Sequence, residues 1–148
     1  MRLSIKNISI ILLIALVGVA ILLPWLLYAI GLGNINGWPE LPTQSKLAED
    51  DAMKVWHELK EKDPIKVEKL NPYDYAAFIL GLKSMEPASG ARLAWFVARN
   101  YNYKNLKDRR NLYWHLSGAS LTIWLTRNWS ADQLLAKAKE IQAIREGN

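Results

Sequence analysis

Few side chains in this sequence are of a type and spacing that could do covalent or metal chemistry. The 148 residues include no cysteine, which excludes disulfides, thiolate nucleophiles and thiolate metal sites. His57 and His115 are far apart, and neither has a second ligand at the spacing of a zinc motif. Glu86 and Glu140 are candidate acid–base groups for glycosidic chemistry, although no spacing rule selects them. We therefore predict no metal and no cofactor.

A cluster of basic residues is the stronger chemical feature. Between Arg92 and Trp129 the segment carries seven basic residues and one acid, Asp108, so its charge of +6 exceeds the net charge of +5 for the whole chain. Such a field attracts anions. The alternative is a solvated face that only keeps the protein soluble.

Aromatic residues accompany these charges. The chain has seven tryptophans, of which Trp124 is interpreted as core, while Trp95 and Trp114 lie beside basic residues. Tryptophan and arginine are enriched in interface hot spots, so both side chains are candidate docking anchors.

An apolar segment near the N-terminus places these residues at a membrane. Residues 8–32 are 25 consecutive residues without a charge, and about 20 such residues in a helix cross the hydrocarbon core. Arg2 and Lys6 precede the segment, so the positive-inside bias keeps residues 1–7 in the cytoplasm. We expect a single-pass protein of a bacterial inner membrane, with residues 8–32 as the transmembrane helix. A cleaved signal peptide is the alternative, but its apolar core is shorter, about 7–15 residues.

The rest of the chain is expected on the exported side, where nucleic acid is an unsuitable partner. Residues 33–44 are rich in glycine, asparagine and proline and are interpreted as a linker or a loop that lies along the surface. Residues 45–148 have helical periodicity, so we predict an all-α domain. Helix starts are expected at Ser45, at Asn71–Pro72, near Ser89, near Leu106 and at Ser130, where Gln133 completes a capping box.

One stretch resembles a known family. Residues 117–128 read SGASLTIWLTRN and are similar to the motif GGSTITQQLxKN of the peptidoglycan glycosyltransferase (transglycosylase) domains of penicillin-binding proteins. Residues 134–140, LLAKAKE, resemble the family's LLRKIKE, and this places Lys137 and Glu140 on its RKxxE motif. The resemblance implies a membrane-anchored, lysozyme-like helical fold.

The same alignment puts Arg99 on the family's catalytic glutamate, Asn100 on the aspartate of the same motif, and Ile123 and Trp124 on its paired glutamines. The family's reaction needs a carboxylate as general base, and a guanidinium stays protonated in proteins. The resemblance therefore implies a degenerate domain that has lost catalysis but keeps an anion-binding surface.

Two hypotheses follow. The preferred one is a non-catalytic domain that binds a partner protein or an anionic cell-envelope precursor, such as an anionic lipid or a lipid-linked glycan, as an accessory subunit of a membrane assembly. The alternative is a divergent transglycosylase or lysozyme-like enzyme that uses Glu140 or Glu86. The predicted binding residues are Arg99, Arg109, Arg110, Trp114, Arg127, Lys137 and Glu140.

Overall fold

The computed structural model describes residues 5–79 and 88–147, and within these ranges the protein is all-α, as the sequence predicts. The helices in chain order are α1 (Ile5–Gly33), α2 (Glu49–Glu58), α3 (Pro72–Ile79), α4 (Ala91–Asn105), α5 (Asn111–Asn128) and α6 (Ala131–Glu146). The pair Glu86–Pro87, where the proline is expected to interrupt the helical periodicity, lies outside the described residues.

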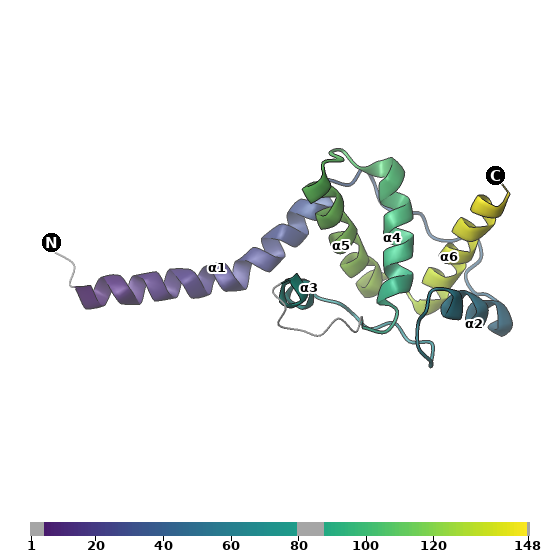
Figure 1. Ribbon diagram of the computed structural model, residues 1–148, viewed down its shortest axis with the longest axis horizontal. Coiled ribbons are helices and arrows are strands. Elements are labelled where there is room, and N and C mark those ends of the chain that lie inside the picture. Colours follow the sequence, from purple (N-terminus) through teal and green to yellow (C-terminus); the bar gives the residue numbers. More distant parts are fainter. Residues whose placement is uncertain (1–4, 80–87, 148) are drawn as a thin grey trace.

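Helix α1 is long and has two distinct halves. Its N-terminal half extends away from the rest of the molecule, and its C-terminal half lies against α5 and α3 (Figure 1). An 18-residue window within residues 7–33 has a mean hydropathy of 3.0, so this helix is long and apolar enough to cross a membrane. The side chains from Ile8 to Leu23 are largely exposed in the isolated chain, as expected of a helix whose solvent is lipid.

Helix α5 is the centre of the fold. It packs between α1 on one side and α4 on the other, and α6 and α2 complete the far layer (Figure 1). Its buried residues include the small residues Ser117, Gly118 and Ser120. Because these residues are small, neighbouring helices can approach closely. A Cβ built on Gly31 of α1 would lie 2.1 Å from Ser120 Oγ, and one built on Gly118 would lie 2.6 Å from the Trp95 ring.

The segment after α1 is a loop that lies along the domain rather than a free linker. The Asn34 side chain donates to Ser117 Oγ (3.0 Å) and to the Asp108 carbonyl (3.0 Å), and its Oδ1 accepts from the Asp108 amide (2.9 Å). Ile35 forms an isolated antiparallel bridge with Leu106. The end of α1 is therefore joined firmly to the α4–α5 connection.

Two of the predicted helix starts are confirmed. At α6 the Ser130 hydroxyl accepts from the Gln133 amide, and the Gln133 side chain accepts from the Ser130 amide, which is the predicted capping box. At α3 the Asn71 side chain accepts from the amides of Tyr73 and Asp74, with Pro72 at the first helical position.

The predicted start near Ser89 agrees with α4, which begins at Ala91, and the Ser89 hydroxyl donates to the Lys66 carbonyl. The other two predicted starts are wrong. Helix α2 begins at Glu49 with no side-chain cap, so Ser45 lies in the preceding loop. Helix α5 begins at Asn111 rather than near Leu106, because Leu106 is held by its bridge to Ile35.

Candidate functional site

The predicted basic residues do not form one patch. Arg109 and Arg110 lie at the N-terminal end of α5, and Arg127 lies in its last turn. Seventeen residues separate Arg110 from Arg127, which corresponds to about 25 Å along the helix axis. Arg99 lies on an exposed position of α4, and Lys137 and Glu140 lie on α6. The +6 segment is therefore divided among several places on the surface.

At the N-terminal end of α5, Arg110 is already paired. Its Nε and Nη2 donate to Asp108 Oδ2 (2.8 and 2.6 Å), and its guanidinium lies 5.1 Å from the centre of the Tyr113 ring. The side-chain hydrogen bond from Arg110 is the main reason that the pKa of Asp108 lies below its usual value. Lys107 Nζ donates to the Gly33 carbonyl (2.7 Å) at the C-terminus of α1, where the helix dipole favours a cation.

Arg109 and Arg99 differ from these residues. Both are exposed, and neither makes an ion pair within the part of the chain that the structure describes. Trp114 is half-buried against the core rather than freely exposed, so only part of its ring remains available to a partner. Arg99 and Arg109 are therefore the predicted binding residues that are most available.

Lys137 and Glu140 form a structural clip. Lys137 Nζ donates to Glu140 Oε2 (3.0 Å), and the backbone amide of Thr43 donates to Glu140 Oε1 (2.5 Å). Burial alone would raise the pKa of Glu140, but these hydrogen bonds outweigh it, and the pKa lies below its usual value. A general acid at neutral pH needs the opposite shift, and the carboxylate here holds the loop after α1 against α6.

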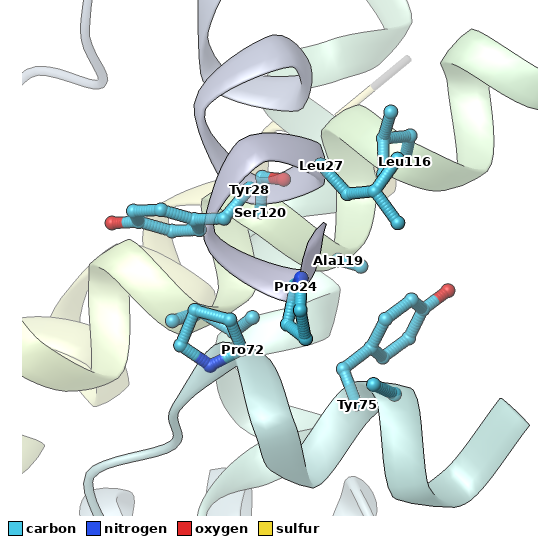
Figure 2. Close-up of a pocket in the computed structure, with 10 residues that line it drawn as sticks. Pro24, Leu27, Tyr28, Pro72, Tyr75, Leu116, Ala119 and Ser120 are labelled. Atoms are coloured by element: carbon cyan, nitrogen blue, oxygen red, sulfur yellow. The ribbon is translucent and has the colours of Figure 1, made fainter. Parts of the chain in front are cut away.

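Beside the middle of α5, the structure forms an apolar notch that the sequence analysis missed. The notch has a volume of about 60 Å³ and lies where α1, α3 and α5 meet. Figure 2 shows its lining around Pro24 of α1, with Tyr75 from α3 and Leu116 from α5. The complete lining is Pro24, Leu27, Tyr28, Pro72, Tyr75, Ala76, Leu116, Ala119, Ser120 and Ile123.

Arg127 lies at one edge of this notch. It follows Ile123 by one helical turn on the same face of α5, and its Nη1 donates to the Leu70 carbonyl just before α3 (3.1 Å). The sequence signal that could have indicated this place is Pro24, a proline inside a long apolar helix.

Metal chemistry has no support among the described residues, where no group of three or more histidine, cysteine or acidic side chains is placed to hold an ion. The His57 Nε2 lies 3.0 Å from Asp63 Oδ1. Glu86 lies outside the described residues. No protein-family model, curated protein or solved structure matches this chain.

Proposed function

We propose that the protein is a membrane-anchored, non-catalytic helical module that binds an anionic envelope component or an acidic partner protein at the membrane surface. The observation that carries the proposal is the rigid connection between anchor and domain. Gly31 packs against Ser120 of α5, and Asn34 bonds Ser117 and Asp108. The domain is therefore held in a fixed orientation relative to α1 rather than on a flexible tether.

This packing also supports α1 as a retained anchor. If α1 were removed as a signal peptide, the α5 face that contacts Gly31 and Leu27 would lose its cover. Exposing this apolar face of α5 to water would lower the free energy of unfolding.

The side chains favour binding over catalysis. In the resembled family's motif the position of the catalytic carboxylate is filled here by Arg99. Glu140, the other candidate acid, is engaged by Lys137 and Thr43. The exposed cations Arg99 and Arg109 lie outside the packed interfaces and are free to attract an anion.

The proposal is tested by placing a photo-crosslinking amino acid beside the two arginines, at the exposed Leu112 near Arg109 and at the exposed Tyr103 near Arg99, in the full-length protein in its native membrane. A matched label at Lys54, an exposed cation of α2, is the control. We expect a specific adduct from the first two positions and none from the third. The association should also weaken as salt rises from about 50 to about 300 mM, because the screening length falls from about 14 to about 6 Å. Identical adducts from all three positions, or none, would contradict the proposal.

A further inference from the structure

We propose that the notch between α1, α3 and α5 holds one acyl chain of an anionic glycerophospholipid, with the lipid phosphate at Arg127. This inference rests on α1 lying in the bilayer, as in the proposed function, and it adds a specific ligand. The argument has three parts, which concern the depth of the notch, its lining and the charge at its edge.

The depth follows from the length of α1. The uncharged run begins at Ile8, and a hydrocarbon core of roughly 30 Å is crossed by about 20 helical residues. The far boundary of the core therefore falls near Leu27. Pro24 and Leu27 both line the notch, so it lies at the level where acyl chains end and headgroups begin.

The position of α3 agrees with this depth. The Tyr73 hydroxyl donates to the Ile21 carbonyl of α1 (2.8 Å), and the Tyr73 ring contacts Trp25 edge to face with centroids 6.4 Å apart. Tyr73 and Trp25 are both exposed. Tyrosine and tryptophan are enriched at the headgroup level. Helix α3 is thus held beside the membrane segment by aromatic residues typical of the interface.

The lining suits an alkyl chain. Carbon atoms of proline, leucine, isoleucine and alanine side chains and of two tyrosine rings form most of the wall, as seen in Figure 2. The volume of about 60 Å³ is well below that of pockets for small molecules, which are roughly 300–1,000 Å³. A section of one chain fits such a space, and it would continue along the exposed apolar surface of α1.

The charge at the edge selects an anionic headgroup. Arg127 is exposed and lies one turn beyond Ile123, which lines the notch. Its Nη1 donates to the Leu70 carbonyl just before α3 (3.1 Å), and this bond holds the guanidinium close to the notch. Arginine binds phosphate oxygens with two parallel hydrogen bonds.

The test uses the purified full-length protein in mild detergent, with native mass spectrometry after addition of dioleoyl-phosphatidylglycerol or dioleoyl-phosphatidylcholine. We expect one retained phosphatidylglycerol. Arg127→Gln should weaken its binding roughly tenfold and remove the preference over phosphatidylcholine. Ala76→Leu, which fills the notch from α3, should weaken the binding of both lipids. The matched controls are Arg145→Gln and Ala143→Leu on the exposed end of α6, and both should bind as the unaltered protein does.

A second measurement does not depend on a variant that folds. Phosphatidylglycerol with a photoreactive acyl chain should label residues 72–76 and 116–123 of the unaltered protein. The proposal would be wrong if the labels were confined to residues 8–20 or if all variants bound the lipid equally. It would also be wrong if inorganic phosphate displaced the lipid. If the protein failed to bind phosphatidylglycerol but the labels beside Arg109 and Arg99 still formed crosslinks, only this inference would be wrong. A mature protein that begins beyond Gly33 would remove the proposed function as well.

Discussion

Glu61 is a buried carboxylate that caps a helix distant from it in sequence. The α4 N-cap is Gly90, in the left-handed region at φ 79°, and it offers no side-chain acceptor. Glu61 Oε1 accepts instead from the amides of Arg92 (2.7 Å) and Leu93 (3.2 Å). One carboxylate thus satisfies two of the unpaired amides at the start of α4 and places a negative charge at its positive end.

We predict that Glu61→Ala lowers the free energy of unfolding by about 1–3 kcal/mol, because the two amides lose their acceptor. Glu61→Gln should have a smaller effect, since an amide oxygen still accepts. Chemical denaturation of the detergent-solubilised protein measures both. Glu68→Ala is the control, because the Glu68 side chain is exposed and, among the residues that the structure describes, makes only a long ion pair with Lys66 (3.6 Å). A loss for Glu68→Ala as large as that for Glu61→Ala would contradict the capping role.

The Glu140 clip gives a prediction about pH. Its pKa is lowered in the folded protein mainly by the Lys137 hydrogen bond, with a further contribution from Thr43, against the opposing effect of burial. The carboxylate therefore stays ionised to a lower pH when folded than when unfolded, where the pKa is about 4.3. Its stabilising contribution is complete above that pH and is lost as the pH falls through the folded value.

Accordingly, the stability difference between the unaltered protein and Glu140→Gln should be constant from pH 7 to about pH 5.5 and shrink below about pH 4.3. Thermal unfolding as a function of pH measures this difference. If Glu140→Gln abolished a glycan-polymerising or wall-digesting activity without changing stability, the structural reading would be wrong.

Residue by residue, the sequence predicted what is local and missed what is distant. Lys137 and Glu140 are three residues apart on one helix, so their pairing can be read directly. The Thr43 amide that completes the clip comes from the loop after α1, 97 residues away. The two acceptor bonds of Glu61 to α4 are distant in the same way, and no local pattern contains either contact.

At the scale of elements, the contact between α1 and α5 depends on a glycine. A Cβ on Gly31 would lie 2.7 Å from the Leu116 carbonyl oxygen as well as 2.1 Å from Ser120 Oγ, so the helices must separate to admit it. Gly18, in the same helix, has nothing within 4 Å of its built Cβ. The two glycines therefore form a matched pair within one helix.

We expect Gly31→Ala to lower the melting temperature in detergent by several degrees, because overpacking of this kind costs about 1–3 kcal/mol. Gly18→Ala should leave it unchanged or raise it slightly, since alanine favours the helix. Circular dichroism during heating measures both. Equal melting temperatures for the two variants would show that the α1–α5 packing does not contribute to stability.

The helix boundaries were also predicted well where local residues fix them and poorly where distant contacts do. The starts of α3 and α6 are fixed by residues within one turn, Asn71 and Ser130, and both were predicted. The start of α5 was placed about five residues too early, because Leu106 is apolar and matches the periodicity but pairs with Ile35 instead. The notch was missed because three helices build it and Pro24 was the only signal in the sequence.

At the scale of the whole molecule, the anchor and the domain share residues. The free half of α1, Ile8–Leu23, is largely exposed, whereas Pro24–Gly33 packs one face, which includes Tyr28 and Gly31, against α3 and α5 and leaves Leu26 and Ile30 exposed. The end of the apolar run predicted a boundary between residues 32 and 33. Packing against α3 and α5 begins about ten residues earlier, because apolar composition does not distinguish a helix face that packs on protein from one that faces lipid.

This division predicts different outcomes for two truncations. Removal of residues 1–23 deletes the free half and one exposed hydrogen bond, from the Tyr73 hydroxyl to the Ile21 carbonyl, so the remaining protein should stay folded and unfold cooperatively near the temperature of the full chain. Removal of residues 1–36 also deletes the cover of Leu116 and Ile123 and the Asn34 contacts with Ser117, Lys107 and Asp108. That loss amounts to several kcal/mol, so we expect the melting temperature to fall by more than about 10 °C. Circular dichroism and size-exclusion chromatography of both truncated proteins in the same detergent measure this. If the two proteins were equally stable, α1 would be only a tether, and the fixed orientation on which the proposed function depends would be lost.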